Sequence, residues 1–285
     1  MQITFENVNY IYNQQTIEEV TALEGINLQI GGDRFIAVIG STGSGKSTLI
    51  QMLNGLLKPT SGRVLFDGKE IFGLKEEKKL LRDLRCKVGL TFQYPEHQLF
   101  ETDVYKDVAF GPKNQGRSKE ETDKCVIKAL DAVGIGEEYY KKSPFELSGG
   151  EMRRVAIAGM LAMEPEMLIL DEPTAGLDPM GKIEILDKLK SIQQEMHITV
   201  VLVSHTMEEV ARYADCVIAL DKGKILFDRE VHAAFADTKA LEEAGLSAPP
   251  VRCFMETLKK SGLDVNENCI TVDEACNEIL KAIGK

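Results

Sequence analysis

An eight-residue loop between a predicted strand and a predicted helix restricts the fold of this chain more than any other feature. Residues Gly40–Ser47 match the P-loop pattern G-x-x-x-x-G-K-[ST]. The apolar run Phe35–Ile39 precedes the loop and the helical segment Thr48–Leu56 follows it, as a phosphate-binding loop requires. A plain glycine-rich turn is the alternative, but the strand, the helix and the Lys-Ser pair all favour the P-loop.

The loop predicts a site for the phosphates of a nucleotide. Glycines allow backbone N–H groups to converge on the β-phosphate, and the positive end of the following helix adds to the field. Lys46 would bridge the β- and γ-phosphates, while the Ser47 hydroxyl would bind Mg²⁺. The candidate nucleotide contacts here are Gly40, Ser41, Thr42, Gly43, Ser44, Gly45, Lys46, Ser47 and Thr48.

A second motif places carboxylates beside this loop. The apolar segment Leu168–Leu170 ends in Asp171 and Glu172. Ligands of open α/β sheets bind at the carboxyl ends of the strands, so both carboxylates would lie near the P-loop. Asp171 would hold Mg²⁺, directly or through water, and Glu172 would polarise the attacking water as the base. The alternative is an acidic pair that merely ends a strand.

Two further strand ends carry polar side chains. His205 follows the strand Thr199–Val203 and could hydrogen-bond the γ-phosphate and position the water. A lone histidine at a strand end is more often structural. Gln93 follows the strand Val88–Phe92 and could reach both Mg²⁺ and the water, or it could cap a loop.

The segment Leu147–Glu151 has two interpretations. Ser148 and Glu151 form a capping box that starts a helix. The serine hydroxyl together with Gly149 and Gly150 at a helix N-terminus also makes an anion site. This segment lies in a helical insertion, where it should not reach its own P-loop, so it would face the γ-phosphate held by a second chain.

The hydrophobic pattern predicts an α/β fold with a parallel sheet. Apolar strands that alternate with helices indicate a sheet buried between helix layers. The candidate strands are Phe35–Ile39, Val88–Phe92, Met167–Leu170, Thr199–Val203 and Cys216–Leu220. Gln2–Tyr12, Ala22–Ile30 and the Asp67-Gly68 hairpin predict a small antiparallel sheet beside it. Capping boxes at Ser118 and Thr271 predict helices in the insertion and in the tail.

Composition excludes some classes of function. The net charge is −11, from 34 Lys and Arg against 45 Asp and Glu, which disfavours broad binding to nucleic acid. No apolar run approaches the roughly 20 residues that span a bilayer, and we expect no signal peptide. Six scattered cysteines without a CxxC motif indicate reduced thiols rather than metal ligands or disulfides.

These motifs, in this order, resemble an ABC-type ATPase cassette. The resemblance rests on Gly40–Ser47, Gln93, Leu147–Glu151, Leu168–Glu172, the segment Ala175–Asp178 and His205. It implies ATP and Mg²⁺ as ligands and two cassettes that enclose two ATP molecules head to tail. Each P-loop would then meet the partner's Ser148 segment, with Asp178 at the interface. An N-terminal aromatic would stack on adenine, Tyr12 rather than Tyr10. Glu151 departs from the commonest family residue, glutamine.

The resemblance also implies an organisation: a cassette over residues 1–230, with a helical subdomain over about 93–165, and a C-terminal extension over 231–285. The cassette would combine a RecA-like parallel core with the antiparallel subdomain. Two stretches, Phe92–Phe100 and Asp107–Asn114, are similar to the ATPases of energy-coupling factor (ECF) transporters and of cobalt and nickel importers. The extension resembles that group's dimerisation extension, and an unrelated helical addition is the alternative.

By this resemblance the partners would be a second ATPase, the same or a paralogue, a transmembrane coupling protein and a small membrane protein that captures a vitamin or metal ion. The chain would lie at the cytoplasmic face of the membrane. The alternatives are the ATPase of a conventional binding-protein-dependent importer and a soluble ATPase acting on nucleic acid or ribosomes. The segment Gln93–Phe110 would dock a basic coupling helix in an acidic groove made by Glu96, Glu101, Asp103 and Asp107, or it would be a solvated loop.

Overall fold

The computed structural model describes residues 1–73, 75–243 and 245–284, so Ala244 and Lys285 of the predicted extension lie outside the described residues. Its central sheet has six strands in the order β10-β9-β3-β8-β7-β6. These are β3 (Phe35–Gly40), β6 (Val88–Thr91), β7 (Met167–Asp171), β8 (Thr199–Val203), β9 (Cys216–Asp221) and β10 (Lys224–Glu230). All pairs are parallel except β9 with β10. The predicted α/β core and its five strands are confirmed.

Side chains on the two faces of this sheet enter two different layers. Phe35, Ala37 and Ile39 of β3 pack into a cluster with residues of α5 (Gly149–Leu161), α6 (Pro179–Met196) and α7 (Met207–Tyr213). Ile36 and Val38 pack on the other side with α1 (Lys46–Leu53) and the antiparallel sheet. Because both faces are covered, every residue of β3 is buried, which explains its continuous apolar sequence.

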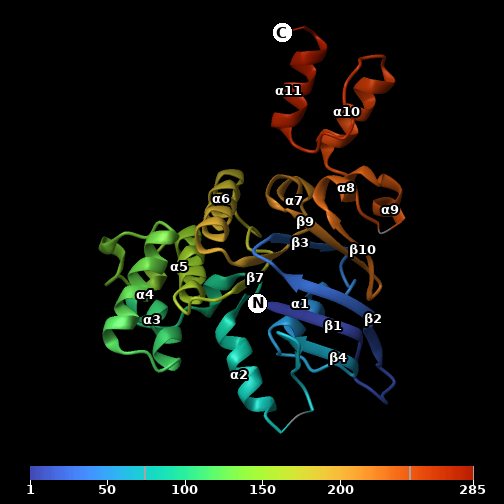
Figure 1. The fold of residues 1–285 in the computed structure, drawn as a ribbon. Helices are drawn as coiled ribbons and strands as arrows, with labels where there is room; N and C mark the ends of the chain where they lie inside the picture. Colours follow the sequence, from blue (N-terminus) through green and yellow to red (C-terminus); the bar gives the residue numbers. More distant parts are fainter. Residues whose placement is uncertain (74, 244, 285) are drawn as a thin grey trace.

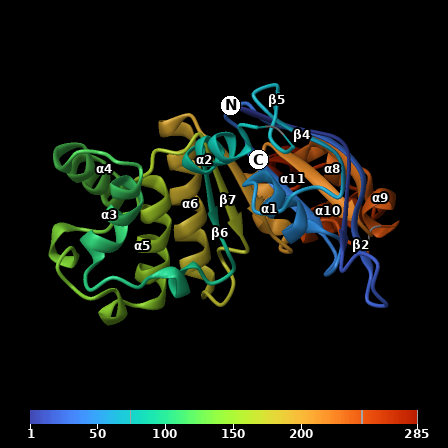
Figure 2. The ribbon, with the colours of Figure 1, turned by 90° about the horizontal axis from the view of Figure 1, so that it is seen from below.

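The antiparallel sheet has the strand order β2-β1-β4-β5. Its strands are β1 (Gln2–Tyr12), β2 (Val20–Gly31), β4 (Ser61–Phe66) and β5 (Lys69–Glu70). Asp67 and Gly68 join β4 to β5 with φ values of 47° and 77°, as the hairpin prediction requires. This sheet and the helical part of the molecule lie on opposite sides of the central sheet (Figures 1 and 2).

The helical part contains α3 (Val104–Asn114), α4 (Lys119–Ala132) and α5, with short 3₁₀ turns η1 (Pro95–Gln98), η2 (Glu137–Tyr139) and η3 (Pro144–Glu146). The predicted capping boxes are present at the starts of α4 and α5. The helix α2 (Glu77–Lys87), which precedes β6, was not predicted from the sequence. It exposes most of its charged residues and buries one leucine, Leu84, so its apolar signal is weak.

The last helices divide into two groups. α8 (Val231–Ala236) and α9 (Thr238–Glu243) bury Ala234, Phe235 and Leu241 in the same cluster as the central sheet. α10 (Pro250–Lys260) and α11 (Val272–Ala282) form their own small cluster around Met255 and stand beyond α8 (Figure 1). The predicted boundary at residue 230 thus precedes two helices that pack on the central core, while α10 and α11 form a separate cluster. Among the residues that the structure describes, no helix combines the length and apolar character needed to cross a bilayer.

Candidate functional site

The P-loop lies where β3 ends and α1 begins, and its shape depends on glycine. Gly45 has φ 103°, and a Cβ atom there would lie 2.5 Å from the Ala22 carbonyl oxygen. A Cβ at Gly40 would lie 2.4 Å from the Leu220 carbonyl oxygen. Neither position has space for a side chain. The loop is thus held against the antiparallel sheet on one side and β9 on the other.

Lys46 folds back onto its own loop. Its Nζ donates hydrogen bonds to the carbonyl oxygens of Gly40, at 2.8 Å, and Ser41, at 2.9 Å. Burial lowers the pKa of Lys46 below 10.5, while the charges of Glu172 and Asp171 act in the opposite direction. The ammonium group therefore stands near the loop, next to two carboxylates, where an anionic phosphate would be attracted to it.

Ser47 and Asp171 meet beside this lysine. The Ser47 hydroxyl lies 3.4 Å from Asp171 Oδ2. Burial and the charge of Glu172 raise the pKa of Asp171, against the effects of Ser47 and Lys46. A half-buried carboxylate whose charge is disfavoured in this way would be stabilised by a cation. The pair offers the hard oxygen ligands that Mg²⁺ prefers, so these residues fit the predicted ion.

Glu172 lies between the other two polar side chains predicted for this site. Gln93 Nε2 donates to Glu172 Oε2 at 3.2 Å, and His205 Nδ1 lies 3.5 Å from Glu172 Oε1. The Glu172 N–H donates to the carbonyl oxygen of Val203, so the neighbouring strand fixes its backbone, which has φ 48°. The structure thus brings together five predicted residues from the ends of four strands: Lys46, Gln93, Asp171, Glu172 and His205.

Tyr12 lies at the end of β1, and its hydroxyl is 3.1 Å from Thr48 Oγ1 in α1. Tyr12 is 37% exposed, and its ring packs edge to face against that of Tyr10. This contact ties Tyr12 to the first turn of the P-loop helix. Tyr12 therefore has both the exposure and the position that stacking on a base would need.

Ser148, Gly150 and Asp178 line a different cleft, of about 430 Å³, between α5 and α6. Ser148 caps α5, and its hydroxyl donates to Glu151 Oε2 at 2.8 Å. The Ser148 N–H and hydroxyl hold the pKa of Glu151 below its usual range, so this carboxylate stays charged. Asp178 caps α6 by accepting a hydrogen bond from the Gly181 N–H. None of the P-loop residues lines this cleft, as the sequence predicted for Ser148.

The sequence of this chain matches those of known ATP-binding proteins. The profile of the ABC transporter family matches residues 23–175. The energy-coupling factor transporter ATP-binding protein EcfA2 of Clostridium tetani is 52% identical, over 99% of this chain and 97% of the relative. Its counterpart in Enterococcus faecalis is 48% identical, over 99% and 97% of the two chains. The chain belongs to the ABC transporter family.

Comparison with solved structures indicates which type of ABC protein the chain resembles. CbiO1 from Clostridium perfringens, part of the ABC transporter complex cbiONQ, is 41% identical with a TM-score of 0.75, covering 89% of this chain and 98% of that one. The ATP-binding cassette MJ0796, in a dimeric post-hydrolysis state with ADP and phosphate, is 29% identical with a TM-score of 0.70, covering 80% and 98%. The protein is an ABC ATPase of the energy-coupling factor type, as its motifs predicted.

The segment after Gln93 carries the acidic residues of the docking groove predicted for this ABC ATPase. Glu96 forms a buried ion pair with Arg153 at 2.7 Å, and Asp103 caps α3. Asp107 Oδ2 accepts from the N–H groups of Phe100 and Glu101. These three carboxylates have hydrogen-bond or ion-pair partners within the chain. Of the three, Asp107 also lines the cavity between α2, α3 and α5, whereas Glu96 and Asp103 are not among its lining residues. Each of the three occupies a place where a backbone donor or a buried arginine needs an acceptor.

Sequence reasoning missed two residues that connect parts of the ABC ATPase. Arg153 of α5 is 2% exposed and donates to the carbonyl oxygens of Pro173 and Ala175, besides its bonds to Glu96. Glu209 of α7 is 8% exposed and accepts from two hydroxyl groups near the site. An arginine or glutamate within an apolar helical stretch was the available signal, because burial of such a charge requires partners.

Proposed function

We propose that Glu172 acts as the base that polarises the water attacking ATP. Its position carries the proposal: a carboxylate at the sheet edge, beside the P-loop lysine, contacts Gln93 on one oxygen and His205 near the other. These neighbours would orient the carboxylate and the water. Lys46 would release the two loop carbonyls and bind the β- and γ-phosphates. The N–H groups of the loop would hold the phosphates at the start of α1.

Mg²⁺ fits the oxygen donors beside this carboxylate. Ser47 and Asp171 would hold the ion, and Gln93 would complete the set from its strand end. The bound ion would neutralise charge on the phosphate oxygens. The observation that supports it is the 3.4 Å distance between the Ser47 hydroxyl and Asp171 Oδ2, which places two oxygen donors side by side next to the P-loop.

A second ABC ATPase would complete the site. Ser148, Gly149 and Gly150 start a helix whose N–H groups and serine hydroxyl could bind a phosphate. Ser148 and Gly150 line a cleft together with Asp178, and no P-loop residue is among its lining residues. The P-loop of a partner cassette could supply that phosphate. The exposed faces of α10 and α11, with Phe254 and Val272 among the residues, would provide a further contact between the ATPases.

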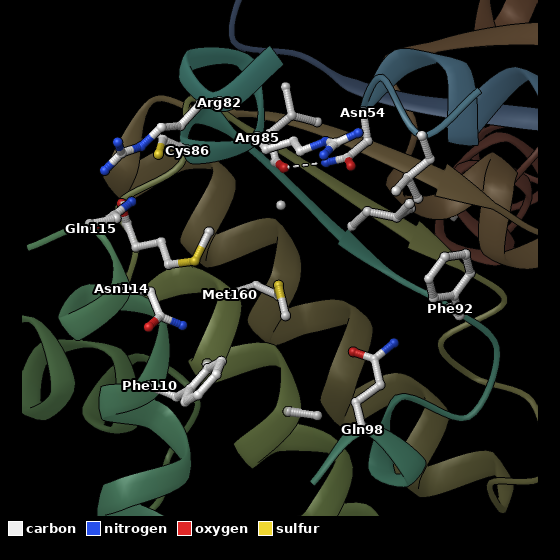
Figure 3. Close-up of a pocket in the computed structure, with 18 of the residues that line it drawn as sticks. Asn54, Arg82, Arg85, Cys86, Phe92, Gln98, Phe110, Asn114, Gln115 and Met160 are labelled. Atoms are coloured by element: carbon white, nitrogen blue, oxygen red, sulfur yellow. Dashed lines mark hydrogen bonds between the residues drawn. The ribbon is translucent and has the colours of Figure 1, made fainter. Parts of the chain in front are cut away.

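A cavity of about 680 Å³ between α2, α3 and α5 offers a docking groove for a transmembrane coupling protein (Figure 3). Phe92, Phe110 and Met160 are among its apolar lining residues. Arg82 and Arg85 stand on the α2 side, and Asp107 is its acidic residue. Residues of β6 line this groove, and the chain runs from the end of β6 to Gln93. A helix docked in the groove would therefore contact the segment that carries Gln93 into the site. The occupant would be an amphipathic helix that presents an apolar face.

Together these features support an ATP-driven importer at the cytoplasmic face of the membrane. The relatives are named as energy-coupling factor transporter proteins, and one structural neighbour belongs to the complex cbiONQ. We propose that the chain drives uptake of a vitamin or metal ion, which a separate membrane protein captures, through the coupling protein. Purification from detergent-solubilised membranes, with identification of the partners, separates this assembly from a conventional binding-protein-dependent importer.

The test of the site is Glu172→Gln in the assembly that hydrolyses ATP. Loss of a general base lowers turnover by roughly 10² to 10⁴. ATP binding should remain, because the phosphate contacts come from the P-loop. A turnover number near that of the wild type would exclude Glu172 as the base.

A further inference from the structure

One buried carboxylate joins two loops that surround Glu172. Glu209, in the first turn of α7, accepts with Oε2 from Thr174 Oγ1 at 3.1 Å and from Ser204 Oγ at 2.9 Å. Thr174 lies two residues after Glu172, in the loop that leads to Asp178. Ser204 directly precedes His205. A single oxygen atom therefore holds both loops.

Both loops have additional supports at the same place. Arg153 binds the carbonyl oxygens of Pro173 and Ala175, on either side of Thr174. The Thr206 N–H donates to Ser204 Oγ at 3.0 Å, so that hydroxyl donates to Glu209 and accepts from its own turn. Close to both His205 and Glu172, these side-chain bonds add to the backbone contacts between neighbouring strands, in which the Glu172 N–H donates to the Val203 carbonyl oxygen.

The second oxygen of Glu209 extends the connection to α6. Lys182 Nζ lies 3.7 Å from Oε1, and Lys182 is in the first turn of the helix that Asp178 caps. Oε1 is buried and has no hydrogen-bond partner among the described residues. The carboxylate thus contacts the loop before Asp178 and the helix after it.

Burial makes a passive role a poor explanation for this glutamate. Glu209, Thr174 and Ser204 are 8%, 5% and 3% exposed. Removal of a carboxylate from water is unfavourable, and an apolar side chain of similar size could fill such a space at lower cost. The carboxylate provides directional hydrogen bonds instead. Because the hydroxyl groups of Thr174 and Ser204 bind the same oxygen atom, the positions of the two loops relative to each other are fixed.

We infer that Glu209 is a positioning residue that holds the Thr174 loop and the His205 turn in one geometry around Glu172. A displacement of Asp178, such as contact with a second ATPase would cause, then reaches His205 through Thr174, Glu209 and Ser204. This inference rests on the proposed roles of Glu172 and His205. It concerns the rate of hydrolysis and leaves the nucleotide contacts of the P-loop unchanged.

The test compares two substitutions at this position in the full chain, within the assembly that hydrolyses ATP. Glu209→Met fills the space without an acceptor, and we expect kcat to fall roughly tenfold to a hundredfold, since small misplacements of catalytic groups have effects of this size. Both hydrogen bonds fall on one oxygen, so the amide oxygen of Glu209→Gln can retain them. That variant should keep kcat within about threefold of the wild type. KM for ATP and the Kd for ATP should change less than about twofold in both.

Controls separate positioning from loss of structure. Glu208→Met changes the exposed neighbour on the same helix and should leave kcat unchanged. Thermal unfolding of each variant is measured alongside its kinetics, because a merely structural role would lower Tm without changing the kcat of folded protein. If Glu209→Met does not fold, Ser204→Ala removes the Ser204 bond to Glu209, together with the bond from the Thr206 N–H, with little change of volume. This variant should lower kcat while the fold remains.

The outcomes distinguish this inference from the proposed function. A folded Glu209→Met with wild-type kcat, or, where that variant does not fold, a folded Ser204→Ala with wild-type kcat, overturns the inference. Equal losses in the Met and Gln variants overturn it too, since charge rather than geometry would then matter. Glu172→Gln is assayed in parallel. Wild-type turnover in that variant would instead refute the proposed base, whatever the Glu209 variants show.

Discussion

Replacement of Glu96 by alanine should destabilise this ABC ATPase strongly, although the residue lies in an irregular segment. Glu96 Oε1 and Oε2 accept from Arg153 Nη2 and Nε at 2.7 and 3.0 Å, which is a two-point ion pair. The side chains are 14% and 3% exposed. Glu96→Ala would leave the guanidinium group buried beside α5 without its counter-charge.

The magnitude follows from the contacts that remain. Removal of one partner from a buried ion pair costs about 3–5 kcal/mol. Arg153 would keep its bonds to the carbonyl oxygens of Pro173 and Ala175, so we expect a loss near the lower end, about 3 kcal/mol in the free energy of unfolding. For a chain of this size that corresponds to a fall in Tm of roughly 5 °C.

Thermal and urea unfolding of the purified chain measure the effect. Glu101→Ala is the matched control, because Glu101 lies in the same segment and takes no part in the ion pair; its Tm should stay within about 2 °C of the wild type. A Glu96→Ala variant with wild-type stability would show that the ion pair contributes nothing. It would also restore the interpretation of Glu96 as a free surface charge.

The pH dependence provides an independent check. Burial alone would raise the pKa of Glu96, but hydrogen bonds and charge from Arg153 outweigh it and hold the pKa below 4.5. A carboxylate with a lowered pKa in the folded state stabilises the fold fully above its unfolded pKa and loses that contribution as pH falls through the folded value. The stability difference between wild type and Glu96→Gln should therefore be constant near neutral pH and shrink below about pH 4.5.

Three further changes have defined outcomes. Lys46→Ala should weaken the binding of ATP roughly 10- to 100-fold, because a charged hydrogen-bond donor is lost; an unchanged Kd and rate would refute its role. Gly45→Ala should abolish nucleotide binding, since its Cβ would meet the Ala22 carbonyl at 2.5 Å, and normal ATP affinity would show that the loop has room for a side chain there. Deletion of residues 250–285 should keep the cassette folded, with a Tm within a few degrees of the full chain, and weaken assembly of the ATPases. Deletion from residue 230 onward should also unfold the core that contains Phe235. Equal assembly by the shorter chain and the full chain, measured by light scattering, would make α10 and α11 a passive addition.

Much of the fold could be predicted because its signals are local. A buried parallel strand needs an apolar run, and the five predicted runs coincide with β3, β6, β7, β8 and β9 to within one residue. A phosphate loop needs glycines in fixed register with a lysine, so the sequence alone located Lys46 and Ser47. The strand ends then indicated Asp171, Glu172, Gln93 and His205, since parallel strands deliver their carboxyl ends to one edge.

The parts of the fold and the site that could not be predicted depend on contacts between residues that are distant in sequence. Glu96 and Arg153 are 57 residues apart, and nothing local distinguishes an acid that meets a buried arginine from one that faces water. The packing of the segment that follows residue 230 could not be predicted for the same reason. Weak sheet signals after Arg229 do not show that Phe235 returns to the central core, where it is 0% exposed.

The carbonyl oxygen of Ala22 is approached by two glycines from different loops. A Cβ on Gly45 would lie 2.5 Å from it, and a Cβ on Gly223, in the turn between β9 and β10, would lie 2.8 Å from it. This contact involves the Ala22 backbone, so it sets no requirement on the side chain at position 22, whereas it excludes a side chain at both glycines. In variants of this chain that remain functional, we therefore expect glycine at positions 45 and 223, with no such requirement from this contact at position 22. A designer who grafts the phosphate loop onto another scaffold would have to bring that carbonyl and the β9–β10 turn with it.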